Sequence, residues 1–224
     1  MILNVVLKMI LRSWWRNKVF FLVSVASLAL GLACTNLLMT YFVHEHGLEG
    51  RNPDRDRMFF LRQDDPMTEG KRVAFAGAEI PPQLKQSYAE VENFLRLGKL
   101  DLLYCKVNEQ KVEGDFKMLS ADTTLTNFFD YRTEEGSLSQ VLCQPGKVAL
   151  SEACARRLFG GKQAVGKQVE AHFRFGEVRP YEVAAVLKKR EQSLLQFDML
   201  IAHDPDFFWG GLTLLKLTPG TDAG

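Results

Sequence analysis

The chain has 224 residues, with 28 Lys plus Arg against 27 Asp plus Glu, so its formal net charge is +1. That balance excludes a general nucleic-acid binder, and 46% hydrophobic with 25% charged residues excludes a disordered chain. The charge is unevenly distributed: residues 1–18 carry +4, residues 19–43 carry none, and the remainder carries −3. We therefore expect three regions in different environments: an interfacial helix at 1–18, a transmembrane helix at 19–46 and a folded domain at 47–224.

The first 18 residues show one polar stripe on an apolar background. Asn4, Lys8, Arg12 and Arg16 recur every four residues. This spacing predicts an amphipathic helix that lies in the membrane interface, although the segment could instead extend the spanning helix. The expected interface anchors are the basic residues and the tryptophans of this region, namely Lys8, Arg12, Trp14, Trp15, Arg16 and Lys18.

The uncharged run from Val19 to Val43 predicts a membrane span. As a helix it is about 37 Å long, whereas the hydrocarbon core of a bilayer is about 30 Å thick. A cleaved signal peptide is a poorer interpretation, because its apolar core is only about 7 to 15 residues long. The basic residues precede the span, which predicts a cytoplasmic N-terminus. In a bacterial inner membrane, the residues after about 44 then face the periplasm.

Small residues form a stripe along the predicted span. Ser24, Ser27, Gly31 and Thr35 follow one another at spacings of three and four, which places them on one helix face. Such a face allows a second membrane helix to approach closely, although Ser and Gly are common enough in membrane helices for the stripe to arise by chance.

The domain after the span begins with apolar stretches at 58–63 and 71–76 that flank turn-forming residues, which predicts a β-hairpin. A short helix is predicted from Ile80 to Tyr88, because two prolines suit its first positions. Strand-like and helix-like segments then interleave, so we expect a mixed α/β (α+β) domain. The further strands are predicted at 94–98, 102–107, 116–120, 147–150, 168–175, 181–187, 197–202 and 212–217, and the further helices at 123–129, 138–142 and 152–159.

The segment Gly161–Gln168 matches the phosphate-loop pattern, except that Gln168 replaces the Ser or Thr that binds magnesium. A phosphate loop follows a strand and opens a helix, whereas this segment follows a predicted helix and leads into a predicted strand. The pattern therefore does not predict nucleotide binding.

Other candidate chemistries lack the required spacing. His44 and His46 point to different sides of a helix, and no third ligand is placed by the sequence. Asp64–Asp65 and Glu134–Glu135 are interpreted as solvated turn residues. An oxidising compartment would permit one disulfide among the three cysteines after the span, Cys105, Cys143 and Cys154. The sequence thus predicts no catalytic residue, no metal site and no cofactor.

Four stretches carry a resemblance to a known family. They are LRSWWRNKVFFLVSVASLALGLA from Leu11, NPDRDRMFFLRQ from Asn52, KVALSEACARRLFGGKQAVGKQV from Lys147 and YEVAAVLKKREQSLLQFDMLIA from Tyr181. Together they resemble the N-terminal part of FtsX-like ABC transporter permeases of the macrolide-export (MacB-like) and lipoprotein-release types, with their periplasmic core domain.

The third stretch is the most specific, and the positions shared in it and in the fourth stretch also have structural explanations. Ser151 is expected to cap a helix, two glycines permit tight turns, and two phenylalanines are expected in the core. The matched positions are Ser151, Glu152, Phe159, Gly160, Gly166, Lys167, Phe197 and Asp198. They indicate a fold and not an active site.

The resemblance implies a permease subunit, not an enzyme, that couples ATP hydrolysis by a partner ATPase to movement of its periplasmic domain for export of a substrate. Such permeases work as dimers with a second copy, and they have at least four spans. With one span in 224 residues, we expect either the N-terminal part of a longer permease or a shortened product. If strands beyond residue 224 complete the sheet, the C-terminal strand leaves an open edge. The alternative function is a single-pass anchored binding or adaptor module without transport activity.

Overall fold

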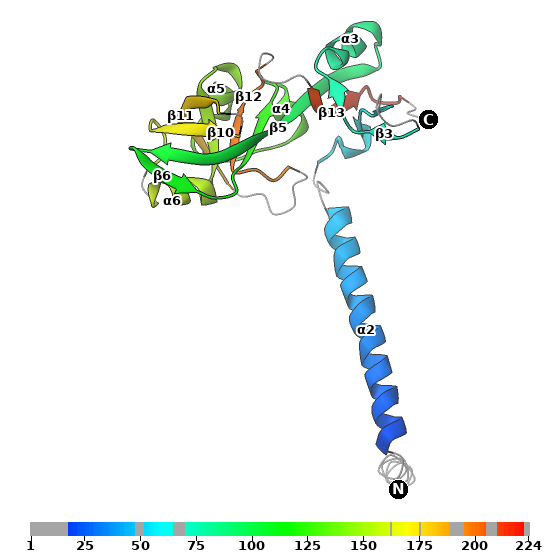
Figure 1. Ribbon diagram of the computed structural model, residues 1–224. Coiled ribbons are helices and arrows are strands. Elements are labelled where there is room, and N and C mark those ends of the chain that lie inside the picture. The colour runs from blue at the N-terminus through cyan, green and yellow to red at the C-terminus, as the bar shows by residue number, and fades with distance from the viewer. Residues whose placement is uncertain are drawn as a thin grey trace. The chain divides into compact units, whose positions relative to one another are not determined.

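The computed structural model describes residues 18–47, 52–64, 70–161, 163–174, 176–188, 195–204 and 210–221. The chain divides into two compact units, residues 1–48 and 49–224. The first contains helix α2 (Lys18–Gly47), one continuous helix of 30 residues over the predicted span (Figure 1). Except for Lys18, the predicted interfacial helix lies outside the described residues.

The predicted hairpin of residues 58–63 and 71–76 is confirmed at its turn end, and the pairing expected for its other residues is wrong. Strands β1 (Met58–Phe60) and β4 (Ala76–Gly77) both pair with β13 (Gly210–Leu217), so the partner of each is at the other end of the chain. Only β2 (Gln63–Asp64) and β3 (Arg72–Val73) pair locally. Of the β1 side chains, Met58 packs at the margin of the second core, whereas Phe59 and Phe60 are 39% and 42% exposed. Turn η1 (Arg55–Arg57) precedes β1, and helix α3 (Ile80–Ser87) follows β4 with its prolines in the first turn, as predicted.

One long strand, β5 (Val91–Val107), replaces the two strands predicted at 94–98 and 102–107. It changes partner along its length: residues 91–97 pair with β13, residues 97–101 with β7 (Lys117–Ala121) and residues 102–106 with β10 (Gln168–Phe173). Figure 1 shows β5 running through the domain from β13 to β6 (Gln110–Glu113). Lys99 and Asp101, in the middle of β5, are exposed to solvent. Their polarity therefore reflects this exposure and does not mark the end of a strand.

Six strands close into a barrel. In order around the ring they are β5, β10, β11 (Val178–Leu187), β9 (Lys147–Ser151), β12 (Met199–Ala202) and β7, and the β5–β7 pairing completes the ring. The pairs β9–β11 and β7–β12 are parallel, whereas the other pairs in the ring are antiparallel. Closure pairs the main chain of each strand on both sides.

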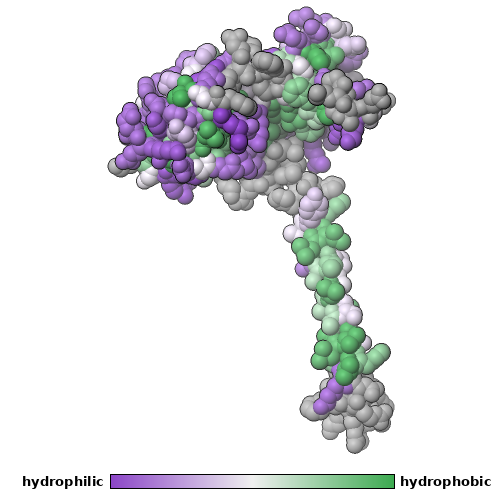
Figure 2. Space-filling view, viewed as in Figure 1, coloured by the Kyte–Doolittle hydropathy of each residue, from purple (hydrophilic) through white to green (hydrophobic). Residues whose placement is uncertain are grey.

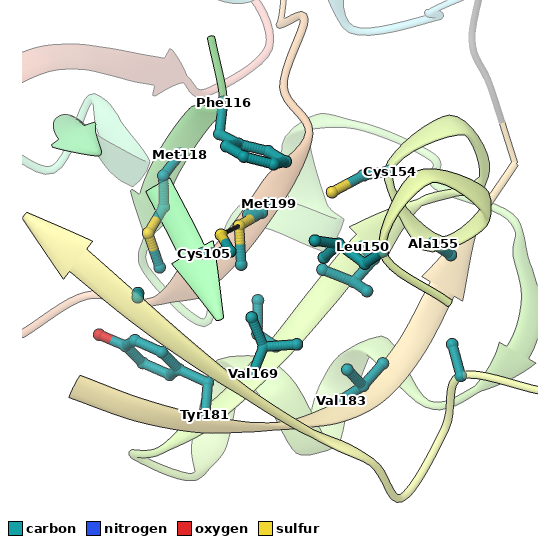
Figure 3. Close-up of a cluster of buried hydrophobic side chains, with 14 of the residues drawn as sticks. Cys105, Phe116, Met118, Leu150, Cys154, Ala155, Val169, Tyr181, Val183 and Met199 are labelled. Atoms are coloured by element: carbon teal, nitrogen blue, oxygen red, sulfur yellow. Dashed lines mark hydrogen bonds between the residues drawn. The ribbon is translucent and has the colours of Figure 1, made fainter. Parts of the chain in front are cut away.

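The barrel interior is a packed apolar core. Alternate residues of the strands point inward, as in β10, where Val169, Ala171 and Phe173 are buried. Figure 3 shows Cys105 and Met199 meeting inside, with their sulfur atoms 3.8 Å apart. Helix α6 (Glu152–Phe159), which follows β9 directly, packs its apolar side against the same core.

The outer faces of the same strands form a second core. Ala149 of β9 and Leu200 of β12 point out of the barrel and pack with helices α4 (Leu125–Phe128) and α5 (Leu138–Cys143). Strands β9 and β12 therefore bury both faces, which is why their sequences read as nearly continuous apolar runs.

The pair Glu134–Glu135, predicted in a turn, lies in strand β8 (Thr133–Gly136), which pairs with β11. All four residues of β8 are exposed, so the strand shows no apolar pattern that would predict it. Gly136 is required there: its φ is +75°, and a Cβ atom would lie 2.0 Å from the carbonyl oxygen of Ala184.

Strand β13 has strand neighbours on both sides, whereas an open edge was expected on the condition that strands beyond residue 224 complete the sheet. It has β5 on one side and β1 and β4 on the other. The fold class itself, one N-terminal apolar helix followed by a mixed α/β domain, is confirmed.

Candidate functional site

Helix α2 buries none of its apolar span within this chain. Side chains from Val19 (79% exposed) to Leu37 (72% exposed) are open along its length, and among the described residues it is the one helix long and apolar enough to cross a membrane. Figure 2 shows α2 mainly green between its ends, whereas purple predominates on the described surface of the domain in this view. In water this apolar surface would be unfavourable, so a lipid environment suits it.

The predicted packing face of α2 is intact but has no neighbour in the described part of the chain. Ser24 Oγ donates to the Phe20 carbonyl and Thr35 Oγ1 donates to the Gly31 carbonyl, both at 2.9 Å. A Cβ atom added at Gly31 would meet nothing within 4 Å. Both hydroxyls thus satisfy their hydrogen bonds inside the helix, which leaves the Ser24, Ser27, Gly31 and Thr35 face free for close packing. The predicted anchors Lys8, Arg12, Trp14, Trp15 and Arg16 lie outside the described residues.

The family-like motif builds the start of α6. Ser151 has an extended backbone and its Oγ accepts from the Cys154 amide at 3.2 Å, so the predicted N-cap is confirmed. Glu152 pairs with Arg156 one turn later. The amide of Ser151 donates to the Asp198 carbonyl at 2.8 Å, and the carboxylate of Asp198 accepts from the Lys117 amide at 2.9 Å. Asp198 therefore ties the start of α6 to β7.

The end of α6 and the following turn are equally constrained. Gly160 has φ +65° and its amide donates to the Arg156 carbonyl, which ends the helix in the left-handed conformation. Phe159 is buried in the barrel core, and the Lys167 ammonium lies 4.9 Å from the centre of its ring. Gly166 has φ +85° and its amide donates to the Val183 carbonyl at 2.8 Å. These residues shape a turn from α6 into β10 and present no reactive group.

Phe197 is only partly buried, where a core position was predicted. It packs at the margin of the second core, 5.6 Å from the ring of Tyr131. Its neighbours 189–194 in the sequence lie outside the described residues.

A cluster of charged side chains holds residues 54–57, which directly precede β1, against the sheet. Lys216 on β13 is 7% exposed; its ammonium contacts Asp54 at 2.5 Å and Glu92 at 3.6 Å. Arg57 pairs with Asp54, donates to Glu92 at 2.6 Å and donates to the Leu217 carbonyl at 2.7 Å. The cluster holds two cations and two anions, so its net charge is zero. We call these four residues the ion lock.

Protonation of the ion lock follows from these contacts. Hydrogen bonds from Lys216 and then Arg57 hold the pKa of Asp54 below its ordinary value. The hydrogen bond from Arg57 lowers the pKa of Glu92 as well. Both carboxylates therefore keep their charge under mildly acidic conditions.

A second ion pair joins β5 to the end of β7. Arg96 donates through Nη2 to Asp122 at 2.7 Å and through Nη1 to the Ala78 carbonyl at 3.0 Å. The carboxylate of Asp122 also accepts from the Arg96 amide at 2.8 Å. Asp122 is buried, so placing the pair there carries a free-energy cost of desolvation. The bidentate hydrogen bonds between Arg96 and Asp122 offset part of that cost.

A cavity of about 460 Å³ lies where β9 and β11 begin and β12 ends. Its charged lining is already paired: Lys147 contacts Glu182 at 2.7 Å, and Arg179 donates to Asp204 at 2.7 Å. Burial, and then Arg96, lowers the pKa of His203 in the same lining. No nucleophile with an adjacent base lines this cavity among the described residues.

The thiols and acidic groups do not assemble a reaction centre in the described part of the chain. Burial raises the pKa of Cys105 to about 12 and raises that of Cys154 as well, so both thiols stay protonated. Cys34 and Cys143 are exposed, and all four cysteines are free. No cluster of His, Cys, Asp or Glu that could hold a metal occurs among the described residues.

Sequence reasoning missed the ion lock and the Arg96–Asp122 pair. A signal was present: Lys216 interrupts the apolar strand LTLLKL, and Arg96 interrupts NFLRLGKL. A charge at an inward position of a buried strand needs a partner. The identity of that partner depends on strand pairing, which the sequence does not provide.

Two solved structures of low sequence identity share the fold, with TM-scores above 0.5. A domain of a protein described as a permease from Porphyromonas gingivalis has a TM-score of 0.60 and 19% identity, over 76% of each chain. The extracellular domain of the noncanonical ABC-type transporter YknZ from Gram-positive bacteria has a TM-score of 0.53 and 16% identity, over 73% of this chain and 83% of that one. The periplasmic region of MacB from Actinobacillus actinomycetemcomitans has a TM-score of 0.46 and 12% identity, over 63% of this chain and 64% of that one.

Comparison with curated proteins gave no significant match. At the level of sequence families, the MacB-like periplasmic core domain matches residues 21–223, which start inside α2 and include the whole described domain. The match covers far more than half of the 224 residues. The resemblance to the MacB-like family is thereby confirmed. The chain belongs to the family of the MacB-like periplasmic core domain.

Proposed function

We propose that this protein acts as the permease subunit of an ABC transporter and couples the cycle of a partner ATPase to motion of its extracytoplasmic domain, to export or extrude a substrate. The observation that carries the proposal is the union, in one chain, of an exposed apolar helix and a MacB-like core domain. The helix supplies the membrane component and the domain supplies the part that moves outside it. The ATP chemistry belongs to the partner in this scheme.

The Ser24, Ser27, Gly31 and Thr35 face of α2 supports contact with another membrane helix. Nothing in the described chain approaches Gly31, and its neighbouring hydroxyls are internally hydrogen-bonded. We propose that the neighbour belongs to the membrane part of the transporter, either in a second permease copy or in further spans. The indirect partner is the ABC ATPase.

The test is recovery of ATPase activity with the tagged native protein. The full protein is purified in mild detergent from membranes of the source cells, and vanadate-sensitive ATP hydrolysis is measured in the eluate. Wild-type protein is expected to retain this activity, Gly31→Leu is expected to lose most of it, and Leu30→Ile serves as the control because Leu30 lies on a different side of α2. Membrane-inserted wild-type protein that carries no ATPase would contradict the proposal and favour the anchored adaptor.

We also propose that the N-terminus is cytoplasmic and that residues after about 44 lie outside the inner membrane. Cys143 is a natural reporter, because it is the exposed thiol of the domain while Cys105 and Cys154 are buried. A membrane-impermeant maleimide is expected to label the wild-type protein in spheroplasts without lysis, and Cys143→Ser is expected to abolish that labelling. Labelling that requires lysis would reverse the orientation.

A further inference from the structure

The segment that follows the anchor enters the domain at a mechanically weak position. Strand β1 runs antiparallel to β13, with Met58 opposite Lys216 and Phe60 opposite Leu214. The hydrogen bonds of such a ladder lie perpendicular to the strands. Tension applied across the strands through the chain before Met58 would load these bonds one after another, starting at the Met58 end, and would peel β1 away.

The ion lock lies at the end of the ladder where peeling would start. Lys216 is the residue opposite Met58, and its ammonium holds Asp54, four residues before β1. Arg57 directly precedes β1 and holds Glu92 at 2.6 Å and the Leu217 carbonyl at 2.7 Å. The segment from Asp54 to Arg57 is thus bound to β5 and β13 before the first ladder bond is reached.

Two further contacts fix the same segment. Asn52 Nδ2 donates to the Phe128 carbonyl at 2.5 Å, and Asn52 Oδ1 accepts from the Asp54 amide at 3.0 Å. The first described residue of the domain is therefore tied to α4 in the second core. Charge-assisted bonds are stronger than the neutral bonds of the ladder, and Lys216 makes its bonds largely out of water.

We propose that the ion lock formed by Asp54, Arg57, Glu92 and Lys216 is the mechanical fastening through which displacement of the anchor reaches β5 and β13. It prevents β1 from peeling, so the displacement is passed to the strands instead of being lost in local unfolding. Strand β5 continues into the barrel, where it pairs with β7 and β10. The lock thus gives the anchor a continuous connection to the barrel. This inference rests on the proposed function, because only a moving anchor needs such a fastening.

The test is constant-force pulling of the full protein in detergent, in a Cys34→Ser background. One handle is attached at position 50 and the other at the exposed Cys143, so that the load passes through the lock. Peeling of residues 52–61 frees a contour length of roughly 35 Å, and the gain in extension is this length less the distance that the folded segment already spans. At equal force, Lys216→Met is expected to raise the rate of this first event by about tenfold.

The matched control is Lys111→Met. Lys111 makes an ion pair with Glu113 at 2.6 Å, but both side chains are largely exposed and lie on β6. Its removal is expected to leave the peeling rate unchanged. If Lys216→Met does not fold, Arg57→Lys provides the second variant, because it keeps the charge and loses the forked contacts to Asp54, Glu92 and the Leu217 carbonyl.

An unchanged peeling rate in the folded lock variant, or a first event in the barrel for the wild-type protein, would overturn the inference. Pulling requires no ATPase, so its outcome is independent of the co-purification test. If the lock variant leaves the peeling rate unchanged but ATPase activity is recovered with the wild-type protein, the proposed role of the ion lock is refuted and the transporter function stands. If the lock variant peels faster but no ATPase activity is recovered, the transporter function is refuted, and the role proposed for the ion lock is refuted with it.

Discussion

Helix α2 and the barrel core are both built from aliphatic and aromatic residues, yet their side chains have opposite surroundings. Leu30 of α2 is 68% exposed within the chain, whereas Leu150 of the barrel is 0% exposed. The difference in the sequence is one of continuity: α2 has an uninterrupted apolar run, whereas the barrel uses short runs separated by turns. Length and interruption, more than hydrophobicity itself, distinguish a helix for lipid from strands that bury one another.

The largest expected effect is truncation in the barrel core. Leu150→Ala should lower the free energy of unfolding of the domain by about 2–5 kcal/mol, because it leaves a cavity among Cys105, Val183 and the other core side chains. The equivalent change in the anchor, Leu30→Ala, should leave that value unchanged. Urea unfolding of the full protein in detergent, followed by circular dichroism, measures both, and equal losses would contradict the contrast.

A charge placed in helix α2 should have the opposite pattern of effects, because it should weaken membrane insertion without changing the stability of the domain. Leu30→Arg is expected to make membrane insertion less favourable by about 2.5–3.5 kcal/mol and to leave the fold of the domain intact. Leu103→Arg, at a residue of β5 that is 46% exposed, is the control. Carbonate extraction of membranes measures retention; firm retention of the Leu30→Arg variant would show that the helix is not held by lipid.

Loss of the cap on α6 should have an intermediate effect. Ser151→Ala removes the acceptor of the Cys154 amide and is expected to lower the free energy of unfolding by about 1 kcal/mol. Ser151→Thr keeps the hydroxyl and should restore most of the loss. A full loss in both variants would mean that the site is sensitive to packing and not to the cap.

Removal of the buried Ser120 hydroxyl tests how much a polar group in the barrel region affects stability. It is 2% exposed, and its hydroxyl has no hydrogen-bond partner among the described residues. Ser120→Ala is therefore expected to leave the free energy of unfolding unchanged or to raise it by up to about 1 kcal/mol. A clear destabilisation in the same urea experiment would reveal a bound water or another partner for the hydroxyl.

The smallest effect on the whole domain is expected from acid. The pKa values of Asp54 and Glu92 are lowered in the folded state, so their contribution is present above the unfolded values, near 4, and is lost as the pH falls through the folded ones. Hydrogen-exchange protection of the Leu61 amide, which donates to the Thr213 carbonyl, should fall in this range relative to barrel amides. Equal loss throughout the domain would point to global acid unfolding.

Much of the fold could be predicted because it depends on local physics. The span follows from a long uncharged run, the cap at Ser151 from a hydroxyl before a helical pattern, and the turn at Gly160 from a residue that tolerates positive φ. The failures involve pairing over long sequence distances. Strand β1 pairs with β13, more than 150 residues away in the sequence. Strand β8 forms only because β11 supplies its pairing partner.

By itself, the sequence indicated the apolar span, most of the strands and helices, and the family, because these depend on composition, periodicity and local backbone preference. Only the tertiary structure decided that β5 pairs with β13 as well as with the barrel strands β7 and β10, that six strands close into a barrel, and that Lys216 meets Asp54 across 162 positions. Those facts depend on register and closure, and a charge in a strand specifies that it needs a partner without specifying which one.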